Sequence, residues 1–145
     1  MLQLQKCAGV EIWCNDSDVV DIAHGAGALL FVDAYQTLGT HPIDVQSLDL
    51  DFLASGNLKY LMGAPGIAFL YVKKAVADQL SPTVTGWFGQ RDPVSFEVDN
   101  LDFAPGARRF DAGTPPVMNA YVARAGMQII NEIGPAAIRS WTEHL

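Results

Sequence analysis

The chain has 145 residues, of which 50% are hydrophobic and 17% charged, a composition typical of one globular domain. Its 9 basic and 16 acidic residues give a net charge of −7, which argues against a nucleic-acid or anionic-membrane surface. Cys7 and Cys14 have neither metal-ligand spacing nor the density of a disulfide scaffold, so we expect a cytoplasmic protein without a metal site.

The first half of the chain predicts strands that alternate with short helices. "GVEIW" (9–13) predicts a strand, followed by a helix from Asp16 or Ser17 to Gly25 or Gly27. "ALLFVD" is an unbroken apolar run, which is typical of a parallel strand that is covered on both faces. After a turn through Pro42 and a short helical piece, "DFLAS" and "GIAFLYV" predict two more strands. This order indicates an α/β fold.

The apolar stretch 52–72 is long enough to raise the question of a membrane span. Asn57, Lys59 and Pro65 interrupt it, together with three glycines, and leave two short apolar pieces. We therefore expect no membrane segment there. The N-terminus also lacks the long apolar core of a signal peptide.

Residues 81–113 show no sustained periodicity and contain 4 glycines and 3 prolines. Irregular segments of this length are usually functional loops, partner contacts or disordered pieces. Disorder is disfavoured by five aromatic residues, Trp87, Phe88, Phe96, Phe103 and Phe110. Few strands are recognisable for a parallel sheet, and this segment has little of its own chain to pack against, so we expect a partner subunit, missing sequence, or both.

A helix is predicted after the irregular segment. Thr114 can cap it and Pro115 suits its first position. Its apolar face is expected to contain Met118, Val122, Ala125 and Ile129. Gly134 and Pro135 should end it, and residues 136–145 read as the start of another helix.

Asp33 stands at the end of a predicted parallel strand, where open α/β sheets bind ligands. The simpler interpretation is that its carboxylate caps the following turn. Three residues on, the amide of Gln36 could reach the same ligand or could be an ordinary solvated side chain. His24 and His41 have no companions at metal-ligand spacing, and we interpret them as structural or exposed.

Lys59 follows the next predicted strand, and it is the only charged side chain from Phe52 to Val72. In a parallel sheet it would emerge at the same edge as Asp33. A lysine that merely extends out of an apolar surface is the alternative interpretation. Apolar surroundings favour the neutral amine, which is the form that makes a Schiff base. "GAPG" after this lysine would let the backbone turn tightly and approach a ligand.

Gly113 and Thr114 stand at the predicted helix start, where free N–H groups can bind an anion or be capped by the threonine alone. A carboxylate, an amide, a lysine and an anion site together match the needs of pyridoxal phosphate.

"LLFVDAYQTLGTHPIDV", "DFLASGNLKYLMGAPGIAFLYV" and "RRFDAGTPPV" resemble the class V aminotransferase family, which includes cysteine desulfurases, selenocysteine lyases and kynureninases. The resemblance covers roughly residues 17–145.

The resemblance implies part of the three-layer, mostly parallel-sheet large domain of the fold type I pyridoxal-phosphate-dependent transferases, with the start of the small domain. Residues 1–80 would belong to the cofactor-binding large domain and carry the Asp and Lys motifs. Residues 81–114 would form an irregular interface segment, and residues 115–145 a helical connection toward the C-terminal small domain. A homodimer is also implied.

The site residues are carried over position by position. The resemblance implies that Asp33 pairs with the pyridine nitrogen, that Gln36 bonds the phenolic oxygen and that Lys59 forms the Schiff base. Thr114, with Gly113, would bind the phosphate of the neighbouring subunit's cofactor. "GWFG" is similar to the kynureninase branch, which makes Trp87 a weaker candidate for that phosphate.

The chain also departs from the family pattern. Leu58 stands before Lys59, where many cysteine desulfurases have a phosphate-binding histidine, so that contact is absent or is replaced by Ser55 or Asn57. The family's phosphate loop, its ring-stacking aromatic residue and its substrate-binding arginine find no counterpart in these residues.

We therefore expect a pyridoxal-phosphate enzyme acting on an amino acid by carbon–sulfur cleavage, carbon–carbon cleavage or amino transfer. Lys59 would act as nucleophile and general base. One alternative is a truncated or degenerate, non-catalytic homologue that keeps part of the fold and a dimer surface. A phosphoacceptor site at Asp33 is a third hypothesis, but it needs an acidic pair at a strand end, and Asp16 and Asp18 precede a helix.

Overall fold

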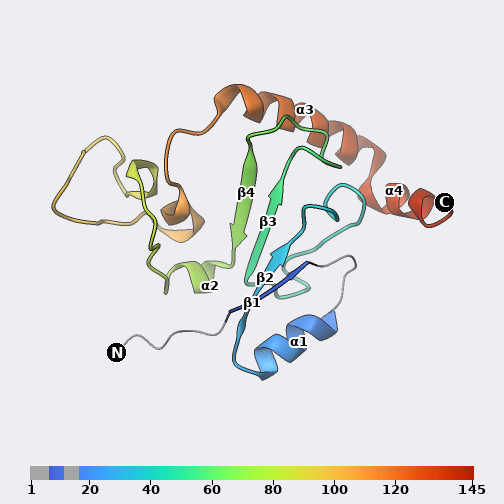
Figure 1. Cartoon of the computed structure of the whole chain (residues 1–145), viewed down its shortest axis with the longest axis horizontal. Helices are drawn as coiled ribbons and strands as arrows, with labels where there is room; N and C mark the ends of the chain where they lie inside the picture. Colours follow the sequence, from blue (N-terminus) through green and yellow to red (C-terminus); the bar gives the residue numbers. More distant parts are fainter. Residues whose placement is uncertain (1–6, 12–16) are drawn as a thin grey trace. The chain divides into compact units, whose positions relative to one another are not determined.

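The computed structural model describes the backbone of residues 7–11 and all of residues 17–145 (Figure 1). It divides into two compact units, which are described separately below. The first unit combines Met1–Leu70 with Pro116–Leu145, and the second unit is Tyr71–Pro115.

A single sheet has the strand order β1-β2-β3-β4. These strands are β1 (Cys7–Glu11), β2 (Leu29–Asp33), β3 (Phe52–Gly56) and β4 (Ala68–Val72). β2 is parallel to both β1 and β3, whereas β4 runs in the opposite direction (Figure 1). The predicted α/β class is confirmed, and the sheet is mixed. The first strand lies slightly earlier than predicted, and positions 12 and 13 fall outside the described residues.

The helix between the first two strands is α1 (Ser17–Gly25). Val20 and Ala23 are its buried side chains, and the chain leaves it through Gly27, whose φ of 68° is the left-handed conformation that favours glycine. The predicted end of this helix is therefore confirmed. Asp16, one of its two predicted caps, lies outside the described residues.

A buried carboxylate, Asp51, ties α1 to the sheet. Asp51 is 2% exposed, and its Oδ2 accepts hydrogen bonds from the Leu30 backbone N–H (2.9 Å) and from His24 Nε2 (2.9 Å). A buried carboxylate is tolerated when such partners satisfy it. The structural interpretation of His24 is thereby confirmed. The surrounding core is aliphatic and contains Leu30, Val32, Ala34, Leu50 and Leu53.

The short helical piece expected after Pro42 is wrong, because this segment consists of turns. Oδ1 of Asp44 accepts the backbone N–H groups of Gln46 (2.9 Å) and Ser47 (3.3 Å), and these bonds lower the pKa of Asp44. Asp49 then adopts a φ of 52°, which ends any helical course. Side-chain bonding to the local backbone thus outcompetes a helix here.

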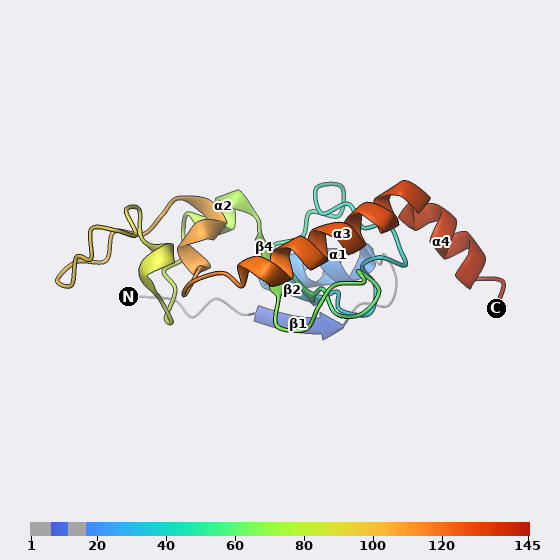
Figure 2. The same ribbon diagram turned by 90° about the horizontal axis from the view of Figure 1, so that it is seen from above.

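The C-terminal helices are α3 (Val117–Ile133) and α4 (Pro135–Thr142), and the chain changes direction between them (Figure 2). α3 begins three residues after Thr114, with Pro116 at its N-cap position and no side-chain cap, so the predicted capping by Thr114 is wrong. Thr114 and Pro115 each precede a proline, and a residue in that position avoids the helical region. The predicted stop at Gly134, whose φ is 89°, is confirmed.

The predicted apolar face of α3 is wrong as well. Its buried residues are Ala123, Gly126 and Ile130, whereas Met118 is 76% exposed. Val122, Ala125 and Ile129 are exposed too. Small side chains let α3 approach the backbone after β3, which large apolar residues would prevent. Of the helices in the described part, none is long and apolar enough to cross a membrane.

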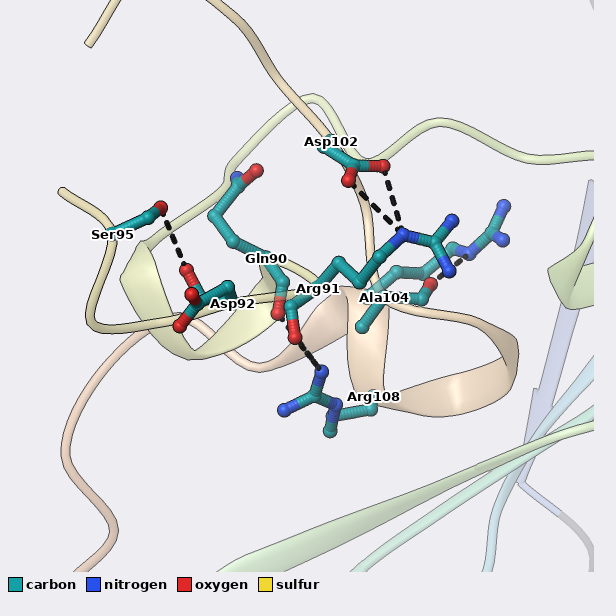
Figure 3. Close-up of polar contacts among 8 residues, drawn as sticks. Gln90, Arg91, Asp92, Ser95, Asp102, Ala104 and Arg108 are labelled. Atoms are coloured by element: carbon teal, nitrogen blue, oxygen red, sulfur yellow. Dashed lines mark hydrogen bonds and ion pairs between the residues drawn. The ribbon is translucent and has the colours of Figure 1, made fainter. Parts of the chain in front are cut away.

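The second unit contains a short helix, α2 (Lys74–Ala77), and two 3₁₀ helices, η1 (Trp87–Gly89) and η2 (Gly106–Phe110). Arginine side chains bind its loops together (Figure 3). Arg108 donates to the carbonyls of Gln90 (3.0 Å) and Arg91 (2.8 Å), and Arg91 pairs with Asp102 (3.0 Å). Hydrogen bonds to loop carbonyls thus give the segment a defined shape without a regular sheet.

Candidate functional site

Asp33 and Lys59 leave the sheet at the same edge. Asp33 is the last residue of β2, and Lys59 follows the end of β3 at Gly56. β2 and β3 are adjacent and parallel, with Asp33 opposite Ala54 in the register. The expectation that both residues emerge at the carboxyl ends of neighbouring strands is therefore confirmed, and open α/β sheets bind ligands at this edge.

The carboxylate of Asp33 is exposed and has one local contact. Its Oδ1 accepts the backbone N–H of Tyr35 at 2.9 Å, which closes the turn after β2. The turn-capping interpretation of Asp33 is thus observed. Gln36 follows on the same turn and is half-buried. A carboxylate and an amide therefore stand three residues apart at the carboxyl end of β2.

Lys59 does not lie in apolar surroundings, so that expectation is wrong. Its side chain is exposed, and its Nζ lies 4.7 Å from the centroid of the Tyr35 ring. The backbone forms a tight turn here, in which the N–H of Met62 donates to the carbonyl of Lys59 (2.9 Å). The amine of Lys59 is therefore accessible, and it lies against the face of the Tyr35 ring.

The glycines after Lys59 serve close packing within the chain. A Cβ on Gly63 would lie 2.8 Å from the Cβ of Asn57 and 3.3 Å from the Cα of Ala123 in α3. The N–H of Gly63 donates to the carbonyl of Asn57 (2.6 Å), and the N–H of Asn57 donates to the carbonyl of Ile67 (3.2 Å). These contacts close residues 57–67 into a loop, called the lysine loop below.

The side chain of Asn57 is buried at 3% exposure, and its Oδ1 has no hydrogen-bond partner among the residues described. A buried polar atom without a partner costs about 1–3 kcal/mol, so this oxygen is suited to a donor on a bound molecule or water. A phosphate oxygen, being an acceptor, would have to be reached through the Nδ2 group. The other candidate, Ser55, already donates its hydroxyl to the Gly56 carbonyl (2.9 Å).

The remaining predicted residues belong to the second unit. Trp87 is 41% exposed in η1, between Phe88 (4.7 Å, edge-on) and Phe96 (5.9 Å, stacked). Gly86 packs against the backbone of Ala112, and Gly89 packs against the carbonyls of Arg109 and Asp111. The turn carrying Trp87 therefore lies against the segment that leads into the exposed Gly113 and Thr114.

We expect Gly86→Ala to destabilise the second unit by roughly 1–3 kcal/mol, because the added Cβ would overlap the backbone of Ala112. Gly113→Ala is the matched control for stability, since nothing lies within 4 Å of a Cβ at that position. Urea unfolding measures both variants. Equal unfolding midpoints would contradict the close packing of these two segments.

Two features of the first unit were not anticipated from the sequence. Tyr35 contacts both predicted groups, and its place between Asp33 and Gln36 was the only available signal. A cleft of about 490 Å³ opens beside the lysine loop, lined largely by apolar residues that include Leu38, Ile43, Leu61, Phe69 and Ile130. In the part of the chain that is described, no group of three or more His, Cys, Asp or Glu side chains could hold a metal ion.

Solved structures share this fold. The apo cysteine desulfurase of Thermococcus onnurineus NA1 has a TM-score of 0.76 and 30% identity, over 90% of this chain and 34% of its own. The cysteine desulfurase CsdA of Escherichia coli has a TM-score of 0.76 and 29% identity, over 94% and 35% respectively. The fold is that of the large domain of the fold type I pyridoxal-phosphate-dependent transferases.

The family model for class V aminotransferases matches residues 7–145, and the chain belongs to this family. The uncharacterized aminotransferase YcbU of Bacillus subtilis is 46% identical over 121 residues, which cover 83% of this chain and 31% of that protein. The kynureninase of Deinococcus radiodurans is 34% identical over 119 residues, covering 81% and 28%. The chain thus spans about 30% of the length of these relatives.

Proposed function

We propose that this chain is the cofactor-lysine portion of a pyridoxal-phosphate enzyme that acts on an amino acid, with Lys59 forming the Schiff base. The observation that carries the proposal is an exposed amine one strand away from an exposed carboxylate, at the carboxyl edge of β2 and β3. Class V family membership supports the same cofactor. When bound, pyridoxal 5'-phosphate supplies an electron sink for the carbanion of the substrate.

The donors and acceptors at this edge fit that cofactor. The carboxylate of Asp33 suits a protonated ring nitrogen, and the amide of Gln36 suits the phenolic oxygen. The Oδ1 of Asn57, which has no partner among the described residues, is a further buried acceptor in the same unit. Lys59, once free of the cofactor, would hold and move the proton at the substrate alpha carbon as a general base.

Residues of the second unit would serve a second copy of the chain. Trp87, Gly113 and Thr114 would bind the phosphate of the neighbouring subunit's cofactor, as the family resemblance implies. The turn that carries Trp87 packs against the segment before Gly113, and this packing supports a common role of these residues in phosphate binding. The enzyme would then be a cytoplasmic homodimer, and carbon–sulfur cleavage, carbon–carbon cleavage and amino transfer are the candidate reactions.

The test is covalent trapping at Lys59. The full-length chain is incubated with pyridoxal phosphate, its visible absorbance is recorded, and the imine is reduced with borohydride before peptide mapping. We expect the label on Lys59, because borohydride fixes the cofactor covalently to the lysine with which it forms the Schiff base. A label spread over Lys73 and Lys74, or none, would favour the non-catalytic homologue.

A further inference from the structure

We propose that Tyr35 is a positioning residue for Lys59, and that its ring holds the resting ammonium at the carboxyl edge of β2 and β3. The inference rests on the proposed role of Lys59. The Nζ of Lys59 lies 4.7 Å from the centroid of the Tyr35 ring, within the range of a cation–π contact. Lys59 is exposed, so this ring restrains an otherwise mobile side chain.

Tyr35 is itself held in two ways. Its backbone N–H donates to Oδ1 of Asp33 at 2.9 Å, so the carboxylate places its backbone. Its ring lies on Gly56, where a Cβ would overlap the ring edge and would come within 2.6 Å of Cζ. Only glycine at the end of β3 leaves room for this ring. Tyr35 therefore connects the carboxylate of β2 with the amine that follows β3.

The contact depends on the charge of the amine. An aromatic face attracts an ammonium through its quadrupole, whereas a neutral amine is not held in this way. The ammonium must lose its proton before it can attack, so the ring contributes to the rate only by keeping the side chain at the sheet edge, where fewer side-chain conformations must be searched.

The contact can be measured without cofactor. Reductive ¹³C-methylation of the lysines keeps their charge, and the Lys59 signal, assigned with Lys59→Arg, should show an upfield ring-current shift. We expect the shift in the full-length wild type and in Tyr35→Phe, and its loss in Tyr35→Leu. Tyr121→Leu, on the exposed face of α3, is the matched control and should keep the shift.

The consequence is measured with pyridoxal phosphate as the probe. The rate of borohydride-trapped labelling of Lys59 should fall by roughly two- to fivefold in Tyr35→Leu, and it should be unchanged in Tyr35→Phe and Tyr121→Leu. Should Tyr35→Leu fail to fold, Gly56→Ala takes its place, because it displaces the ring instead of removing it.

The two proposals fail in different ways. If Tyr35→Leu keeps both the shift and the labelling rate of the wild type, the positioning role is overturned even when Lys59 is labelled. If no variant, including the wild type, is labelled at Lys59, the proposed function is overturned, and the positioning role, which rests on it, falls with it. If Tyr35→Leu is the only variant that loses the ring-current shift and is labelled more slowly at Lys59, both proposals are supported.

Discussion

Lys59→Ala is expected to remove the borohydride-trappable cofactor and to lower kcat by about 10²–10⁴-fold, the range attributed to a positioned acid–base group. Lys59 is the exposed amine at the carboxyl edge of β3, and alanine can neither bond to the cofactor aldehyde nor carry a proton. Steady-state kinetics of the full-length chain with cysteine, kynurenine and an amino donor, together with the cofactor spectrum, measure the effect.

The matched control is Lys74→Ala, in the first turn of α2 in the second unit. It removes the same side chain and the same charge from a different place, and it should leave kcat and the spectrum unchanged. A Lys59→Ala variant that retains the wild-type kcat would contradict the Schiff-base assignment. Equal losses in both variants would point to a general effect of lysine removal.

Gly126→Val is expected to lower the free energy of unfolding by roughly 3 kcal/mol, the upper part of the usual range for overpacking. A Cβ on Gly126 would overlap the carbonyl of Leu61 and would come within 2.7 Å of the carbonyl of Met62. Both carbonyls belong to the lysine loop, which hydrogen bonds hold closed. The loop cannot give way without breaking those bonds.

Urea unfolding of the full-length chain measures the change as a shift of the midpoint at constant m value. Gly126→Ala should fall between the parent and the valine variant. Gly25→Ala, at the end of α1, is the control, because no atom of the described residues lies within 4 Å of a Cβ there and its effect should stay within about 0.5 kcal/mol. A Gly126→Val variant as stable as the parent would show that close packing of α3 on the lysine loop is dispensable.

Much of the sheet could be predicted from local signals. The unbroken apolar run before Asp33 predicts a buried parallel strand, and β2 occupies Leu29–Asp33. Glycine and proline at 134 and 135 predict the break between α3 and α4, because they act on their own backbone. Parallel neighbours then require Asp33 and Lys59 to leave at one edge, which the register confirms.

Features that depend on neighbours could not be predicted in this way. The apolar stripe through Met118 and Ile129 is a good amphipathic pattern, yet α3 buries Ala123, Gly126 and Ile130 instead. The buried face of α3 is decided by the distance between the helix and the lysine loop, and this distance cannot be predicted from the sequence pattern of one helix. The same holds for Lys59, whose isolation in the sequence predicted apolar surroundings, whereas the structure exposes its side chain.

By itself, the sequence determined the α/β class, the strands, the family and the edge at which a carboxylate and a lysine emerge, because these follow from periodicity, backbone preferences and motif order. Only the tertiary structure decided which face of α3 is buried, why Gly126 and Gly56 cannot carry a Cβ, and that Tyr35 lies under the ammonium of Lys59. Those contacts join residues far apart along the chain, and their energies depend on distances that exist only after folding.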